Sequence, residues 1–323
     1  MSDLPIRRAL PAASRMVYGA MGLGGAWDET PIGRADVTTA QRCIETALAS
    51  GITVFDHADI YALGKAERAF GAALAAQPGL RDRMIVQSKC GIRFADAHGP
   101  KRYDLSREWI VASVERSLER LGIERLDVLM LHRPDALMAP DEIAAAFSQL
   151  HAQGKVAHFG VSNMHAAQIA LLGRTLDQPI IVNQIEMSLL ARDAFEQGVL
   201  AGHPQGADMN FAPGLLEQAV AGDIQLQAWG SLAQGWLSGR DVSQARPALA
   251  AAASLVARLA DTYNTTREAI VLAWLMRHPA RIQPVLGTTD AARIRACAAG
   301  VDIALSREDW YQLWESVRGE ALP

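Results

Sequence analysis

The sequence predicts a (β/α)8 barrel, because eight short apolar segments alternate with longer segments of helical periodicity. The apolar segments are rich in β-branched residues and show little polar alternation, as is typical of parallel strands buried on both faces. They span residues 14–21, 52–56, 83–89, 126–132, 156–163, 179–186, 224–229 and 281–287. A doubly wound sheet fits this count less well, and we expect residues 1–323 to form a single barrel domain.

The first helices are marked by apolar stripes and capping residues. Asp36 is expected to cap a helix that ends before Gly51. A later helix is expected to begin near Ser106 and to stop at Gly122. The apolar stripes of these two helices comprise Val37, Ala40, Ile44, Ala47 and Leu48, and Ile110, Val114, Leu118 and Leu121.

The later helices carry similar signals. One ends before Gly154, and another is opened by a capping box of Thr265 and Glu268. A terminal helix begins at Ser306 and is expected to pack outside the main body. The apolar residues of the first and last of these helices include Ile143, Phe147, Leu150, Trp310 and Trp314.

Three segments that follow strands are long, at residues 90–106, 187–215 and 233–250. Long loops in a compact domain are usually functional. In a (β/α)8 barrel the loops after strands lie on the catalytic face, so we expect these three to surround a site.

Composition excludes several classes of protein. The chain has 323 residues, with 31 Lys+Arg and 35 Asp+Glu and a formal charge of −4, and half of it is hydrophobic. Disorder is excluded, and the near-neutral charge gives no support for nucleic-acid or membrane-surface binding. No apolar segment reaches the ~18 residues of a membrane span, and the N-terminus lacks the apolar centre of a signal peptide. We expect a cytoplasmic protein with no metal site, since the three scattered cysteines form no metal motif.

Polar residues end several of the predicted strands. Asp56, Lys89 and His132 end three consecutive ones, where burial would be costly without partners. Taken singly, each could be a loop cap or a buried structural residue. Because the strands of a barrel end at one mouth, their convergence indicates a site. Later strands end in Ser162, Asn163, Gln184 and Trp229.

Tyr61, five residues after Asp56, completes a set suited to proton transfer to a carbonyl oxygen. Tyrosine ordinarily has a pKa near ~10, and we expect an adjacent Lys89 ammonium to lower the pKa of Tyr61. The expected order is Asp56, Lys89, Tyr61 and substrate oxygen, with His132 steering that oxygen.

These residues lie in specific motifs, and the chain resembles the aldo-keto reductases over nearly its whole length. The motifs are FDHADIY (55–61), SKCGI (88–92), LDVLMLHRPD (126–135), GKVAHFGVSN (154–163), NQIEMS (183–188) and VLGTTDAARI (285–294). The resemblance implies a (β/α)8 barrel that reduces an aldehyde or ketone with NADPH. It also implies that the catalytic residues are Asp56, Tyr61, Lys89 and His132.

The resemblance further implies the cofactor contacts. Ser162, Asn163 and Gln184 would hold the nicotinamide carboxamide, and Trp229 would stack on the ring. Gly230, Ser231 and Leu232 would lie near the pyrophosphate, and Gly22 would be a further cofactor-binding residue. Gly287, Thr288, Thr289 and Arg293 would bind the adenosine 2′-phosphate, which favours NADP over NAD. Trp27 would line the substrate pocket.

Two other functions remain open at this stage. A Schiff-base aldolase could use Lys89 as its nucleophile. A non-catalytic barrel could bind NADP as a redox-sensing or scaffold subunit. For the reductase we expect a small carbonyl compound as substrate and a monomer or small homo-oligomer.

Overall fold

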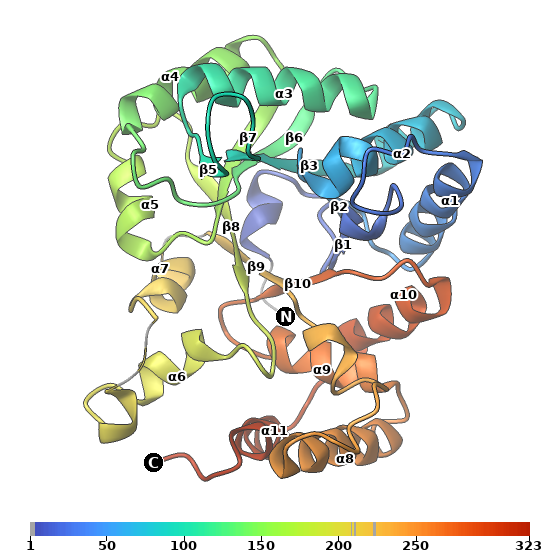
Figure 1. Ribbon diagram of the computed structural model, residues 1–323. Helices are drawn as coiled ribbons and strands as arrows, with labels where there is room; N and C mark the ends of the chain where they lie inside the picture. The colour runs from blue at the N-terminus through green and yellow to red at the C-terminus, as the bar shows by residue number, and fades with distance from the viewer. Residues whose placement is uncertain (1–3, 208, 210, 222–223) are drawn as a thin grey trace.

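The fold is a closed barrel of eight parallel strands, as the sequence predicts (Figure 1). The computed structural model describes residues 4–207, 209, 211–221 and 224–323. Each predicted strand segment contains one observed strand. In order around the barrel the strands are β1 (Val17–Gly19), β10 (Gln283–Leu286), β9 (Gln225–Trp229), β8 (Ile180–Glu186), β7 (Val156–Ser162), β6 (Leu126–Leu131), β3 (Ile85–Cys90) and β2 (Val54–Asp56).

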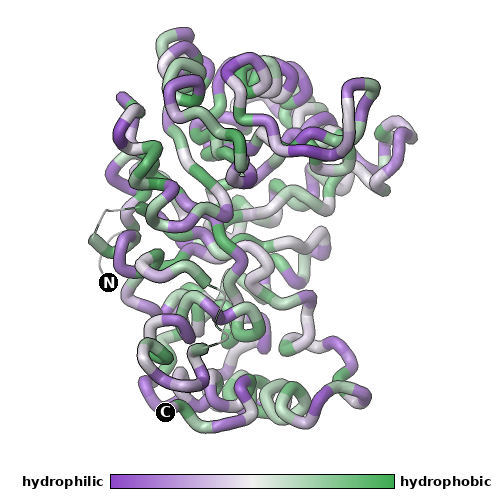
Figure 2. Tube along the Cα trace, turned by 60° about the vertical axis from the view of Figure 1, so that its left-hand side comes forward, coloured by the Kyte–Doolittle hydropathy of each residue, from purple (hydrophilic) through white to green (hydrophobic). Residues whose placement is uncertain are grey.

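Helices surround this barrel and connect its strands. They are α1 (Arg34–Ala49), α2 (Lys65–Ala75), α3 (Arg107–Leu121), α4 (Pro140–Ala152), α5 (Ala166–Leu172), α6 (Asp193–Val199), α7 (Leu215–Ala221), α8 (Pro247–Thr262), α9 (Arg267–Met276), α10 (Ala291–Ala298) and α11 (Arg307–Arg318). Long hydrophilic segments lie mainly in the outer loops (Figure 2). Among the described residues, none of these helices combines the length and apolar character needed to cross a bilayer.

An N-terminal 3-10 helix, η1 (Pro5–Arg8), contributes to the apolar cluster at one end of the barrel. Its Ile6 is fully buried against strand residues such as Val17 and Val54. The barrel interior is therefore apolar at this end. Polar side chains are left to fill the rest of the interior.

Helix caps confirm some of the predictions and correct two. Ser106 caps α3 and Gly122 ends it in the left-handed conformation, as predicted. The predicted cap Asp36 is wrong, because the helix starts earlier and the Asp36 carboxylate accepts from the N–H of the true cap, Gly33, at 2.8 Å. The predicted cap Thr265 is also wrong by one residue, since Thr266 accepts the N–H of the third helical residue of α9.

The C-terminal helix α11 is confirmed and packs against α8 and α9 (Figure 1). Its Ser306 cap is as predicted. The indole rings of Trp274 and Trp310 stack at 5.0 Å, and each indole N–H donates to the other residue's main-chain oxygen, at 3.0 and 2.8 Å. Both indoles therefore satisfy their polar atoms within an apolar contact.

The three predicted long loops contain structure of their own. Segment 90–106 forms a hairpin of β4 (Ile92–Arg93) and β5 (Arg102–Tyr103). Segment 187–215 holds α6, and its residues 208 and 210 lie outside the described part. Segment 233–250 begins with a 3-10 turn and runs into α8.

Close packing of α2 on α3 gives a test of this fold. A Cβ added to Gly71 would lie 2.4 Å from the main-chain oxygen of Arg120, whereas one added to the exposed Gly198 of α6 would meet nothing within 4 Å. We expect Gly71→Ala to lower the free energy of unfolding by about 1–2 kcal/mol despite better helix propensity. Gly198→Ala should raise it by about 0.5 kcal/mol. Denaturant unfolding of both variants measures this difference, and equal effects would contradict the packing.

Candidate active site

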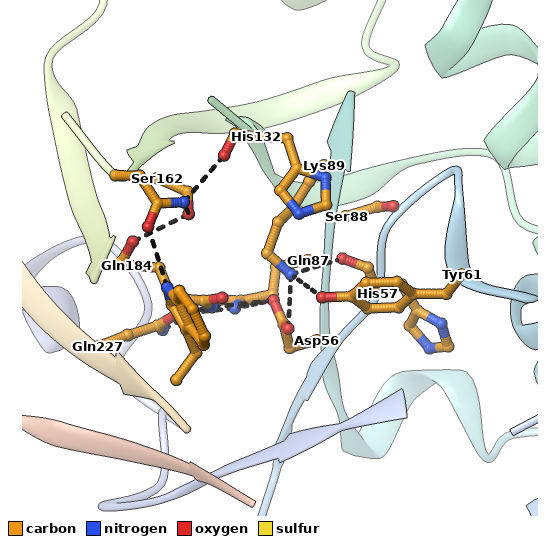
Figure 3. Close-up of polar contacts among 12 residues, drawn as sticks. Asp56, His57, Tyr61, Gln87, Ser88, Lys89, His132, Ser162, Gln184 and Gln227 are labelled. Atoms are coloured by element: carbon orange, nitrogen blue, oxygen red, sulfur yellow. Dashed lines mark hydrogen bonds and ion pairs between the residues drawn. The ribbon is translucent and has the colours of Figure 1, made fainter. Parts of the chain in front are cut away.

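Lys89, at the end of β3, lies at the centre of the site. Its Nζ donates to Asp56 Oδ2 at 2.6 Å, to the main-chain oxygen of His57 at 2.9 Å and to Tyr61 Oη at 3.0 Å (Figure 3). An ammonium has three N–H groups, and all three are used. Since Tyr61 Oη accepts from Lys89, its own proton is left to point elsewhere. The structure therefore brings these predicted residues together in the expected order.

Burial and charge act together on the ionisable groups here. Burial alone would lower the pKa of Lys89, but Asp56 and Tyr61 outweigh it and the net pKa is raised. Burial raises the pKa of Tyr61 above its ordinary value, with a further contribution from Asp56, and outweighs the opposing effect of Lys89. The predicted lowering of the Tyr61 pKa is therefore wrong. The physical reason is that burial of the hydroxyl, with a smaller contribution from Asp56, outweighs the effect of the adjacent ammonium.

His132 follows β6 and faces Tyr61, with the two ring centroids 6.0 Å apart in an edge-on arrangement. Burial, together with Lys89 and Arg133, lowers the pKa of His132 well below its ordinary value. The imidazole is therefore neutral at physiological pH. The main-chain oxygen of His132 accepts from Asn163 Nδ2 at 3.1 Å, and this hydrogen bond links the end of β6 to the end of β7.

A strained turn positions Tyr61. The turn spans Tyr61–Gly64, and Ala62, Leu63 and Gly64 all have positive φ, at 48°, 59° and 85°. Left-handed backbone costs about 1 kcal/mol or more at each non-glycine residue. The main-chain N–H of Asp59 donates to the Lys89 oxygen at 3.0 Å and holds the turn against β3.

Ser162, Asn163 and Gln184 form one connected group at the ends of β7 and β8. Both Gln184 N–H groups donate into the barrel, to Asp56 Oδ1 at 3.1 Å and to Gln227 Oε1 at 3.0 Å. Asn163 Nδ2 donates to Ser162 Oγ at 2.8 Å, and Ser162 Oγ donates to the Gln184 main-chain oxygen at 2.9 Å. The donors of this group are therefore occupied, and it has only oxygen lone pairs left to offer.

Trp229, at the end of β9, is tied to the same group. Its Nε1 donates to Asn163 Oδ1 at 3.1 Å, and the Arg133 guanidinium lies over its ring at 5.8 Å from the centroid. Glu186, the last residue of β8, lies close to the residue that follows Trp229. A Cβ added to Gly230 would be 3.5 Å from Glu186 Oε1. Burial raises the pKa of Glu186, against the opposing effect of Arg133. No carboxylate among the described residues forms an ion pair with Arg133.

The turn after β9, which is predicted to lie near the pyrophosphate, adjoins β10 and the residues that are predicted to bind the 2′-phosphate. Ser231 Oγ donates to the Val285 main-chain oxygen at 2.8 Å, which joins the turn after β9 to β10. Gly230 has φ +67°, and a Cβ on Gly22 would lie 3.1 Å from Thr289 Cγ2. Leu232 packs against two of the apolar clusters, while Gly287 has no atom within 4 Å of an added Cβ.

Arg293, in the first turn of α10, has weak partners. Its Nη2 is 3.4 Å from Ser238 Oγ, its Nε is 3.4 Å from Glu268 Oε1, and its side chain is 41% exposed. Two N–H groups at the start of α10, which the sequence assigns to a phosphate, donate instead to Asp290 Oδ1 at 2.7 and 3.2 Å. The main-chain N–H of Asp290 donates to Thr288 Oγ1 at 3.2 Å. At the start of α10, side chains rather than main-chain N–H groups are therefore available to bind a phosphate.

Trp27, the predicted pocket residue, lies 51% exposed in the loop after β1. The sequence analysis did not identify Gln87, Gln227 and Gln283, which are fully buried on β3, β9 and β10. Gln87 pairs with Asp56 in the strand register, and Gln227 pairs with Gln184 and Gln283. A signal was present, because an amide inside an apolar strand needs hydrogen-bond partners.

Comparison with known proteins agrees with this geometry. The aldo/keto reductase family model matches residues 15–318. The chain is 37% identical over 312 residues to a 6-dehydroglucose reductase of Agrobacterium fabrum, covering 95% of both chains, and 34% identical over 335 residues to one of Novosphingobium aromaticivorans, covering 100% of both. An aldo-keto reductase of Klebsiella pneumoniae, solved with NADPH, superposes with a TM-score of 0.72 at 24% identity, covering 96% of this chain and 93% of that one. The chain therefore belongs to the aldo/keto reductase family.

Proposed function

We propose that the protein reduces an aldehyde or ketone to an alcohol with NADPH, and that Tyr61 is the general acid. The observation that carries this proposal is the direction of the Lys89–Tyr61 hydrogen bond. Because Lys89 donates to Tyr61 Oη, the tyrosine proton is free to pass to the substrate oxygen. Neutral His132 lies beside the same hydroxyl and would help to hold that oxygen.

The residues present fit a nicotinamide cofactor. Ser162, Asn163 and Gln184 offer acceptors only, which suits the NH2 group of a carboxamide. Trp229 offers an aromatic face, and Arg293 offers a half-exposed guanidinium for a 2′-phosphate. When bound, the reduced nicotinamide supplies the hydride. The NADPH-bound structural relative supports the same cofactor.

The two rival functions are less consistent with the site. A Schiff-base lysine must attack as the neutral amine. Lys89 instead has a raised pKa and donates all three N–H groups. A purely cofactor-binding barrel would have no need of the strained turn that directs Tyr61 at Lys89.

We propose a sugar aldehyde of the 6-dehydroglucose type as the substrate. Two relatives that match the chain over most of its length carry that name. Arg133 and Glu186 support the proposal. A carboxylate and a guanidinium without an ion pair among the described residues, both near Trp229, suit a neutral, polyhydroxylated molecule.

Substitution of the proposed acid tests the mechanism. We expect Tyr61→Phe to lower kcat by about two to four orders of magnitude, since the proton donor is removed while Lys89 and Asp56 remain. Turnover is followed with NADPH and a panel of aldehydes that includes 6-dehydroglucose. Quenching of tryptophan fluorescence should show unchanged NADPH binding. Retained turnover would count against Tyr61 as the acid.

The pKa directions predict the pH dependence of reduction. The acid form of Tyr61 persists below its pKa, which lies above the ordinary value of about 10. His132, with its lowered pKa, is neutral over the same range. We therefore expect kcat for reduction to stay flat from about pH 8 to pH 10. Burial raises the pKa of Asp59 to about 7, so the Asp59→Asn variant serves as the control for titration of that carboxyl group. A loss of rate centred near pH 8 in both proteins would refute this assignment.

Cofactor choice is tested at α10. Arg293→Ala should weaken NADPH binding about tenfold or more, which is the effect of losing a charge-assisted hydrogen bond. NADH binding should change little. Arg295→Ala is the matched control, since Arg295 is exposed on the same helix. If the two variants behave alike in fluorescence titrations, Arg293 does not hold the 2′-phosphate.

A further inference from the structure

A chain of buried amides runs through the barrel interior beneath the candidate site. Gln87, Gln227 and Gln283 have no exposed surface, although apolar branched residues usually fill such a barrel. An unpartnered amide in this position would be costly, so each needs defined hydrogen bonds. The proposed mechanism does not use these three residues.

The hydrogen bonds connect a backbone carbonyl at one end to Asp56 at the other. Gln283 Nε2 donates to the main-chain oxygen of Ser14 at 2.6 Å, and Gln227 Nε2 donates to Gln283 Oε1 at 2.9 Å. Gln87 Nε2 then donates to Gln227 Oε1 at 2.8 Å and to Asp56 Oδ1 at 2.7 Å (Figure 3). Gln184 Nε2 donates to the same two oxygens.

This chain has a fixed direction. A carbonyl oxygen can only accept, so the NH2 group of Gln283 must face Ser14 and its oxygen must face Gln227. Gln227 must then turn its NH2 group toward Gln283, and the same group also donates to Gln87 Oε1 at 3.1 Å. The Gln227 oxygen accepts from Gln87. A reversed amide anywhere would set two donors or two acceptors against each other. The same direction delivers N–H groups, never oxygens, to Asp56.

We propose that Gln87 and Gln227 are positioning residues for the reductase reaction and that they act through Asp56. Gln87 donates directly to Asp56 Oδ1, whereas Gln227 acts one step away. Gln227 Oε1 accepts from Gln87 and from Gln184, and so orients the N–H groups that these two residues give to Oδ1. Oδ2 is left facing Lys89. The charged Asp56 holds the Lys89 ammonium under Tyr61 Oη. This inference rests on the proposed function, because it concerns the orientation of the same proton donor.

Gln225 provides a matched control on the same strand. It is also fully buried on β9, two residues before Gln227. Its Nε2 donates to the main-chain oxygens of Leu226 and Arg281, both at 2.9 Å, and not toward Asp56. Loss of either glutamine therefore removes a buried amide, but only the loss of Gln227 interrupts the chain of amides that leads to Asp56.

The experiment compares Gln227→Leu with Gln225→Leu in the full-length protein, using NADPH and the best aldehyde found for the wild type. We expect Gln227→Leu to lower kcat about tenfold beyond any effect of Gln225→Leu, because it removes the acceptor that orients Gln87 and Gln184 toward the Asp56 carboxylate. Titration of tryptophan fluorescence should show NADPH affinity changed similarly in both. Thermal unfolding shows whether the two variants are equally destabilised.

The split between kcat and KM separates positioning from stability. The loss in Gln227→Leu should fall on kcat with KM unchanged, because Lys89, Tyr61 and His132 are all present but the proton donor is less well oriented. If Gln227→Leu cannot be purified, Gln227→Met of similar length replaces it. Equal kcat in the Gln227 and Gln225 variants overturns the proposal. An inactive wild type would instead refute the proposed function.

Discussion

The buried ion pair between Asp56 and Lys89 is the interaction on which the site depends. Their side chains are only 2% and 1% exposed, and a buried charge is tolerated only when it is paired and hydrogen-bonded. Both conditions are met here, because every Lys89 N–H and both Asp56 oxygens have partners. Parallel strands make this feasible, since β2 and β3 end side by side and bring the two side chains to one mouth.

The pair also explains why the barrel interior is polar where most barrels are apolar. A carboxylate at the inner end of the site needs donors from the barrel interior, and Gln87 on β3 and Gln184 on β8 supply them. Gln87 lies opposite Asp56 in the strand register, and Gln227 lies opposite Gln184. The register that closes the barrel therefore also assembles the amide chain, so fold and site share one set of constraints.

Sequence alone could predict the barrel and the residues at the strand ends, because periodicity and strand ends are local signals. Asp56 and Lys89 are identified in this way, and Tyr61 by its chemistry and its place five residues after Asp56. The structure brings the three within hydrogen-bond distance. The role of Gln227 could not be predicted, since its partners lie on other strands and depend on register. The direction of the Tyr61 pKa shift depends on how burial and the Asp56 charge together balance the Lys89 charge in three dimensions. Helix starts shifted by one to three residues for a similar reason, as capping geometry decides them.

The raised Tyr61 pKa bears on how the proposed role of Tyr61 as an acid is to be understood. A lowered pKa would make the hydroxyl a stronger acid, but part of it would then be ionised and unable to donate. Hydride addition to a carbonyl produces an alkoxide, whose conjugate acid is far weaker than a tyrosine. Proton transfer is therefore favourable without any lowering of the Tyr61 pKa. What the site must supply is direction, and the Lys89 N–H at 3.0 Å from Oη supplies it by occupying the oxygen and leaving its proton for the substrate.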